Sequence, residues 1–367
     1  MAHSTVSHMV SPNSSGRRIC LVILGMHRSG TSLLAGALGL LGASLPKHMM
    51  PPSGANPKGY FEPQKIVGLH DDMLSAMRSS WIDIRHLDLS GRGPTAAAEF
   101  KDRLTATVDD EYGDSSIFVV KDPRICRFFP LWREVADTVG AEARVIMVIR
   151  NPIEVARSLG VRDGLSTDYC LNLWLRHVLD AELESRHCKR VFVNYADFLN
   201  GWMKIIDQVE DRLDIQLSAR TSDVQAAVEA FIDREMRHHT IDNKTLELEC
   251  SGHPLIAEAY GALERLTKQS DDRAAKSVLD HVRESFDGAM RILGDGFCAD
   301  LFSVQAKLYS ATSRIAELEN HVSDFNSLAE NLDSAQWTVQ KLKDTLAERT
   351  NEIAALNSSL VGSAGEK

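Results

Sequence analysis

Short apolar runs, separated by stretches with helical spacing, mark the first part of this chain. They lie at Ile19–Leu24, Ser116–Val120, Val145–Ile149 and Arg190–Tyr195. Such runs are typical of strands in a parallel sheet, because helices bury both faces of that sheet. The pattern therefore predicts an α/β fold with a small parallel β-sheet flanked by helices.

Helical spacing continues further along the chain. Asp168–His187 carries apolar residues on one helical face, and Val224–Met290 is helical in pattern apart from polar breaks. Neither stretch contains a chemical motif, so we interpret the first as a core helix. The second is interpreted as a helical region that could cover a cleft beside the sheet.

The carboxyl-terminal segment carries a heptad pattern and has neither Gly nor Pro between Gly296 and Gly362. This pattern predicts a long amphipathic helix that forms a coiled coil with a second copy or a protein partner, or else packs on the rest of the chain. A second apolar row begins at Leu308, Ile315 and Val322 and later becomes polar, so the seam drifts or weakens in its second half. The main row consists of Leu318, Phe325, Leu332, Val339, Leu346, Ile353 and Leu360.

These patterns divide the chain into a sheet domain and a helical extension. We expect a polar, disordered tail at 1–18, a catalytic domain at 19–300, the coiled-coil helix at 301–361 and a flexible tail at 362–367.

The clearest chemical signal follows the first apolar run, where Ile19–Ala35 reads ICLVILGMHRSGTSLLA. A strand, a glycine-bounded turn and a helix start place backbone N–H groups at a helix N-terminus, which favours anions. An ordinary tight turn is the alternative. The candidate anion ligands are Gly25, His27, Arg28, Ser29, Gly30, Thr31 and Ser32.

This turn resembles the P-loop of nucleotide triphosphatases but departs from it at a decisive position. Gly25 and Gly30 have the P-loop separation, yet Thr31 stands where the P-loop requires Lys. The basic residue lies inside the turn instead, as Arg28. A kinase or NTPase would therefore lack its main phosphate-binding cation.

A second candidate anion site follows the run Val145–Ile149. Arg150 emerges at the carboxyl end of that predicted strand, Asn151 is a good N-cap and Pro152 suits the first helical position. Ser158 could share a helical face with Arg150. The alternative is a surface arginine paired with a nearby acid such as Glu154. Ligands of open α/β sheets bind beyond the carboxyl ends of the strands, so both anion sites are expected at one edge.

Together these segments resemble the sulfotransferases that use 3′-phosphoadenosine 5′-phosphosulfate (PAPS). The GMHRSGTS turn is similar to that family's 5′-phosphosulfate loop, and Arg150 with Ser158 resembles its 3′-phosphate motif. Lys121-Asp122-Pro123 and Asn56–Glu62 are similar to segments of the tyrosylprotein and bacterial carbohydrate-type branches. The resemblance spans roughly Ile19 to Leu199 and implies sulfuryl transfer from PAPS to a hydroxyl, with a carbohydrate or glycolipid as the favoured acceptor.

The roles of the charged residues follow from the chemistry of that reaction. Arg28 and Lys121 could stabilise the charge that develops on the leaving phosphate oxygen. Glu62, before a predicted helix at Pro63–Met77, is the preferred general base, although it could serve only as a helix N-terminal acid. The rivals for the base are His27, expected to pack inside the turn, and His70, expected to face solvent.

Two further side chains are expected near this edge, Asp122 and Tyr195. Asp122 is expected to orient Lys121 or Arg124 rather than to react. Tyr195 could contact the nucleotide or the acceptor, although a packed residue at the end of a strand is the alternative. We find no spacing of metal ligands in the sequence, and the reaction requires no metal.

Composition narrows the remaining possibilities. The net charge of −10 over 367 residues argues against a general nucleic-acid-binding protein. Six scattered cysteines with no CxxC pair indicate reduced thiols. The run Ile19–Leu24 is too short for a signal peptide or membrane helix, so we expect a cytoplasmic enzyme. Two alternatives remain open, a P-loop-type kinase or NTPase and a non-catalytic scaffold that presents the coiled coil.

Overall fold

In a computed structural model of the chain, residues 17–52, 56, 58–87, 94–232, 252–293 and 295–364 are described. The chain divides into two compact units, Met1–Ser303 and Val304–Lys367. The predicted tail at 1–18 lies almost wholly outside the described residues.

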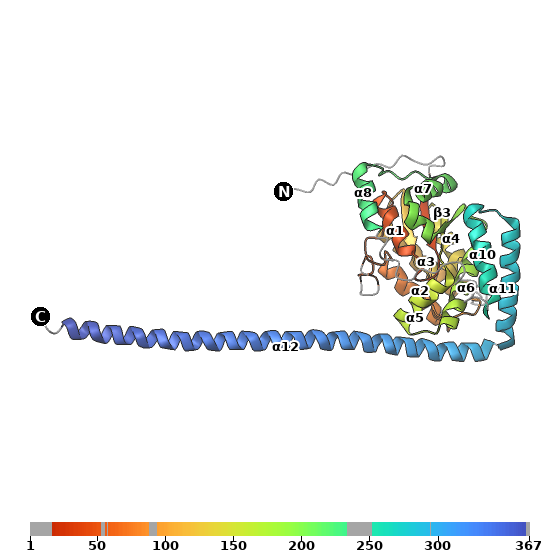
Figure 1. Cartoon of the computed structure of the whole chain (residues 1–367). Helices are drawn as coiled ribbons and strands as arrows, with labels where there is room; N and C mark the ends of the chain where they lie inside the picture. The colour runs from red at the N-terminus through yellow and green to blue at the C-terminus, as the bar shows by residue number, and fades with distance from the viewer. Residues whose placement is uncertain are drawn as a thin grey trace. The chain divides into compact units, whose positions relative to one another are not determined.

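The first unit (Figure 1) is built on a four-stranded parallel sheet. The order of its strands is β2-β1-β3-β4. This confirms the predicted α/β class and the small parallel sheet. The strands are β1 (Arg18–Leu24), β2 (Ile117–Lys121), β3 (Ala141–Ile149) and β4 (Arg190–Asn194).

Helices connect and cover these strands. In chain order they are α1 (Thr31–Leu40), α2 (Gln64–Ala76), α3 (Pro94–Tyr112), α4 (Ile125–Thr138), α5 (Pro152–Asp163), α6 (Thr167–Glu184), α7 (Tyr195–Leu213), α8 (Ser222–Phe231), α10 (Pro254–Lys268), α11 (Arg273–Leu293) and α12 (Asp295–Ala364).

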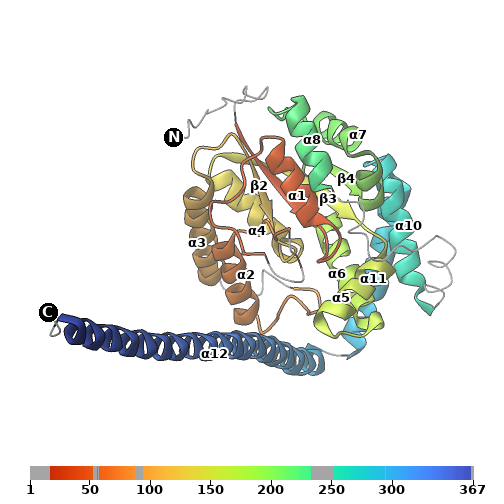
Figure 2. The same ribbon diagram turned by 60° about the vertical axis from the view of Figure 1, so that its left-hand side comes forward.

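Helices bury both faces of the sheet, which explains why the strand sequences are unbroken apolar runs. One face packs under α1, α7 and α8, which lie together along that side in Figure 2. Alternate residues of β1 illustrate the arrangement, since Leu21 and Ile23 enter this layer while Val22 is buried on the other face. Helix α4 contacts β3 and α6.

The order of the strands places a switch point between β1 and β3. The chain leaves β1 for β2 on one side and then crosses to β3 on the other. In open α/β sheets the crevice beyond the carboxyl ends of such strands binds ligands. The turn after Leu24 and the residues after Ile149 meet at this crevice.

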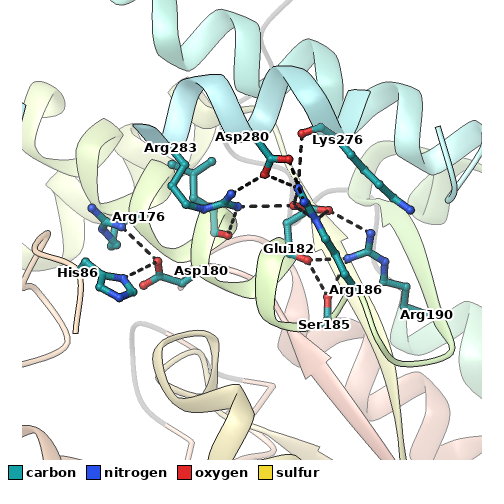
Figure 3. A network of polar contacts seen from close by, with 11 residues as sticks. His86, Arg176, Asp180, Glu182, Ser185, Arg186, Arg190, Lys276, Asp280 and Arg283 are labelled. Atoms are coloured by element: carbon teal, nitrogen blue, oxygen red, sulfur yellow. Dashed lines mark hydrogen bonds and ion pairs between the residues drawn. The ribbon is translucent and has the colours of Figure 1, made fainter. Parts of the chain in front are cut away.

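Buried charges fasten α11 to α6 and β4, as Figure 3 shows. Glu182 of α6 is fully buried and forms ion pairs with Arg186 and Arg190 at 2.7 and 3.0 Å. Arg186 also binds Asp280 of α11 at 2.7 Å, and Arg283 of α11 lies 3.6 Å from Glu182. Because an uncompensated buried charge is costly, this network fixes α11 against the sheet domain.

The second unit consists of α12 from Val304 onward. The predicted long helix is present, and it forms one uninterrupted element (Figure 1). No helix within the described ranges is both long and apolar enough to cross a membrane.

Candidate functional site

The turn between β1 and α1 is shaped by two glycines. Gly25 has φ of 151°, and a Cβ atom there would lie 2.9 Å from the carbonyl oxygen of Val148. Gly30 has φ of 93°, and a Cβ atom there would collide with the ring of Tyr195. Both positions therefore require glycine for conformation and for space.

The amide groups of this turn are not equally available to a ligand. The Gly25 N–H donates to Cys126 Sγ at 3.2 Å, and the Ser29 N–H donates to the Met26 carbonyl at 3.1 Å. The Ser29 amide, one of the candidate phosphate donors, is therefore engaged within the turn itself. Thr31 and Ser32 open α1, where first-turn amides have no carbonyl of a preceding turn to bind.

Arg28 connects the two predicted anion sites. It adopts φ of 68°, an uncommon conformation for a residue with a side chain, and its Nε donates to Ser158 Oγ at 2.8 Å. Arg150 in turn donates to the Arg28 carbonyl at 2.8 Å. The segments after β1 and β3 thus form one site, as the sheet-edge argument predicts.

Arg150 forms the ion pair that the alternative interpretation proposed, and it also contacts Tyr195. It binds Glu154 at 2.9 Å, the pairing that the alternative proposed, and its guanidinium lies 4.5 Å from the centre of the Tyr195 ring. Asn151 caps α5 as predicted, since its side chain accepts from the Ile153 N–H at 2.9 Å. These contacts hold Arg150 at the edge of the pocket.

A pocket lies beyond the carboxyl ends of the strands. Most of the predicted site residues line it, whereas Gly25, Ser29 and Ser158 do not. The predicted residues in the lining are His27, Arg28, Gly30, Thr31, Ser32, Glu62, Lys121 and Arg150.

The lining also contains residues that sequence reasoning either missed or left open. Arg162 lies one helical turn after Ser158, and this i+4 spacing could have identified it. Tyr195 lines the pocket and is buried, so its position at the end of the strand contributes to the site. Phe231 reaches the pocket from α8 and packs edge-on against Phe61 at 5.8 Å, a contact with no sequence signal.

Positive charge gathers in this pocket. Burial, together with the neighbouring Arg162 and Arg150, lowers the pKa of the Arg28 guanidinium. Ser29 Oγ and His27 Nε2 are buried and have no hydrogen-bond partner among the residues that the structure describes. Crowded cations fit an anionic ligand, and of the two orphaned atoms only His27 Nε2 belongs to a residue that lines the pocket.

Lys121 joins the turn to the candidate base. Its ammonium donates to Ser32 Oγ at 3.0 Å, to the Tyr60 carbonyl at 3.1 Å and to Glu62 Oε1 at 2.5 Å. Lys121 and Glu62 are both buried. Burial raises the pKa of the Glu62 carboxyl and outweighs the opposing charge of Lys121.

His70 does not face solvent, and that expectation is wrong. Its side chain is fully buried, Nδ1 lies 2.7 Å from Asp122 Oδ2, and Nε2 accepts from Trp132 Nε1 at 2.8 Å. The Trp132 donor fixes the tautomer, so Nδ1–H donates to Asp122. With both ring nitrogens engaged, His70 cannot take a proton from a substrate.

His27 is also a poor candidate for the base. Its ring packs edge-on against Trp81 with centroids 4.7 Å apart, as the packing expectation proposed. Burial, with the charges of Arg162 and Arg124, lowers the pKa of its imidazole well below the usual value. An imidazole whose pKa is lowered in this way is a weak proton acceptor.

Asp122 orients Arg124 and His70 rather than Lys121. It accepts from the Arg124 backbone N–H at 3.0 Å and from its guanidinium at 3.1 Å. Burial acts to raise the pKa of the Asp122 carboxyl, but Arg124 and the His70 hydrogen bond outweigh it and hold that pKa well below its usual range. Among the described residues, no three His, Cys, Asp or Glu side chains form a group that could hold a metal.

Likenesses to known proteins are found among solved structures. No family model matches the chain, and no curated protein matches it significantly. The sulfotransferase domain of a Synechococcus olefin synthase is 16% identical, with a TM-score of 0.37, covering 70% of this chain and 97% of that one. The sulfotransferase domain of the curacin biosynthetic pathway is also 16% identical, with a TM-score of 0.34, covering 63% and 90%.

A Mycobacterium avium sulfotransferase is 14% identical, with a TM-score of 0.36, covering 64% of this chain and 76% of that one. Similarities this distant carry no argument about activity. A functional conclusion must therefore come from the residues of the pocket themselves.

Proposed function

We propose that this protein is a sulfotransferase that moves the sulfuryl group of PAPS to a hydroxyl of an acceptor. The observation that carries the proposal is the position of Lys121. Its ammonium contacts Ser32 of the anion turn and also Glu62, so one cation adjoins both the candidate nucleotide site and the candidate base.

PAPS carries anionic groups at its 5′ and 3′ positions, and the pocket offers cations from two strand ends. The turn, with Arg28 and the first amides of α1, would hold the 5′-phosphosulfate. Arg150, with Ser158 beside Arg28, would hold the 3′-phosphate. The guanidinium groups of Arg150 and Arg162 beside Arg28 support an anionic occupant at the first position.

The reaction itself is a displacement at sulfur. The acceptor oxygen forms a bond to sulfur while the bond from sulfur to the bridging oxygen of the 5′-phosphate breaks. Glu62 takes the proton of the acceptor hydroxyl, and its raised pKa suits that task. Lys121 and Arg28 stabilise the charge that moves onto the bridging oxygen, an interaction stronger in the transition state than in the ground state.

The acceptor is proposed only by class. Tyr60, Phe61 and Phe231 give the pocket an aromatic side near Glu62. Aromatic faces suit the apolar faces of sugar rings as well as other apolar groups. A carbohydrate or glycolipid remains the favoured acceptor on the resemblance of the Asn56–Glu62 segment.

Calorimetric titration tests the nucleotide assignment without knowledge of the acceptor. The intact protein is titrated with 3′-phosphoadenosine 5′-phosphate, and in parallel with ATP and Mg²⁺. We expect binding of the bisphosphate without metal, weakened in Arg150→Ala. Binding of ATP with Mg²⁺ but not of the bisphosphate would replace this proposal with the kinase alternative, and binding of neither would favour the scaffold.

A further inference from the structure

Helix α12 exposes an apolar seam along most of its described length. The large apolar residues of this α12 seam have exposed fractions between 47% at Leu318 and 75% at Phe325. The helix continues through them without a break. At 1.5 Å per residue, the stretch from Ile315 to Ile353 is roughly 60 Å long. A narrow apolar stripe of this kind is the geometry of a coiled-coil interface.

The α12 seam consists of two heptad registers joined at one point. On either side of that point, consecutive seam residues are alternately three and four positions apart in the sequence. At the point itself, Val322, Phe325 and Leu328 are separated by two successive steps of three residues. This equals an insertion of three residues, which changes the register without ending the seam. The seam residues are Ile315, Leu318, Val322, Phe325, Leu328, Leu332, Ala335, Val339, Leu342, Leu346, Arg349 and Ile353.

The residue types at the a and d positions of the seam indicate how many helices the coiled coil contains. In the first register Ile315 occupies an a position and Leu318 a d position. In the second, the a positions alternate between leucine (Leu332, Leu346) and a branched residue (Val339, Ile353), and Leu342 occupies a d position between Ala335 and Arg349. Branched residues at a with Leu at d favour two parallel strands. This combination recurs on both sides of the register change.

The positions of Arg349 and Arg314 agree with a parallel two-stranded coiled coil. Arg349 occupies a d position and binds Glu352 at 2.7 Å on the helix surface. In a two-stranded coiled coil, the guanidinium of an arginine at a d position can extend to solvent. In bundles of more helices the core is further from solvent, so this is harder. In a parallel pair, Arg314 at a g position faces Glu319 at the e position of the other strand, an attractive contact.

The register change also argues for a second copy of the same chain. A strand that pairs with α12 along this length must change register at the same level. A second copy aligned in parallel and in register does so automatically. An antiparallel copy centred on the seam would place its own register change elsewhere. We therefore propose that α12 forms a parallel, in-register, two-stranded coiled coil that makes the protein a homodimer.

The first test is the mass of the full-length protein in solution, by sedimentation equilibrium. We expect twice the chain mass of 40.6 kDa. Leu332→Glu with Leu342→Glu places charge in the seam and should yield monomers. Trp337→Glu is the matched control, since Trp337 is 66% exposed at an f position on the opposite face and should leave the dimer intact. A wild-type monomer, a trimer, or an equal effect of both variants would overturn the proposal.

The second test concerns direction and register, and it does not depend on a variant that dissociates. Leu318→Cys and Leu342→Cys lie on either side of the register change, and Trp337→Cys is the control. Under mild oxidation we expect both seam variants, but neither the control nor the wild type, to form covalent dimers. An antiparallel pair would hold two copies of residue 318 roughly 50 Å apart. Failure of either seam variant to cross-link would refute the parallel, in-register pairing.

Discussion

Glu62 and Lys121 form a buried ion pair, with Oε1 and Nζ 2.5 Å apart. The pair unites two segments that are distant in sequence, the loop before α2 and the end of β2. Lys121 also binds Ser32, so the candidate base is tied to the turn that follows β1. In the proposed reaction, the negative charge of PAPS would compete with Glu62 for the lysine.

Separate substitutions of this pair should have different effects on turnover and binding. Glu62→Gln removes the proton acceptor, so we expect loss of sulfuryl transfer with retained binding of 3′-phosphoadenosine 5′-phosphate. Lys121→Ala should lower turnover on the order of 10²-fold or more, as loss of one transition-state stabiliser does. The measurement is product formation over a panel of sugar acceptors. Near-normal turnover of Glu62→Gln would reject its role as the base.

A double-mutant cycle can measure how far Glu62 and Lys121 stabilise each other. Removing either partner of a buried ion pair typically costs about 3–5 kcal/mol, whereas removing both together often costs little. We expect Glu62→Gln and Lys121→Met to be destabilising singly, and their combination to cost less than the sum. Urea unfolding of the four proteins gives the coupling energy. Additive effects would show that the two side chains do not stabilise each other.

Arg150 should act chiefly through nucleotide binding. Hydrogen bonds to charged groups contribute about 1.5–3 kcal/mol, so Arg150→Ala should raise the Kd for the bisphosphate about 10- to 100-fold. The control is Arg133→Ala, an exposed arginine of α4 that does not line the pocket. Calorimetry measures both. Equal affinities of the two variants would remove Arg150 from the nucleotide site.

Asp122 should make stability depend on acid pH. Its pKa is held below the usual value in the folded protein, so the stabilisation is present above the unfolded-state pKa of about 3.9. It is lost as the pH falls below that value toward the folded-state pKa. We expect Asp122→Asn to be destabilised at pH 7 and the difference from wild type to shrink in acid. The exposed Asp211→Asn should track the wild type. A pH-independent difference would contradict this linkage.

Gly30 should tolerate no side chain. Gly30→Ala combines φ of 93° with a collision against the Tyr195 ring, so we expect loss of nucleotide binding and a lower Tm. Gly261→Ala, inside α10 with open space around it, should instead gain about 0.5–1 kcal/mol from helix propensity. Thermal unfolding compares the two, and unchanged binding in Gly30→Ala would contradict the tight packing of the turn.

The sequence determined the local elements of the site. Apolar runs predicted the strands because burial on both faces leaves no polar position. Glycine spacing predicted the turn, and Asn151 with Pro152 predicted the start of α5, since caps and fixed φ angles act over a few residues. Arg28 could be placed in an anion turn because a helix N-terminus follows it directly.

The tertiary structure decided everything that depends on neighbours distant in sequence. His70 was expected on the surface, but Asp122 and Trp132 bury it between α2 and α4. The Ser29 amide, a candidate phosphate donor, donates to the Met26 carbonyl within the turn.

Phe231 and the link from Lys121 to Ser32 gave no sequence signal, because a helix face does not specify which loop it meets. Hydrogen-bond partners and burial arise when the elements pack together. The sequence therefore specified the chemistry that the strand ends carry, and the strand order β2-β1-β3-β4 brought that chemistry into one pocket.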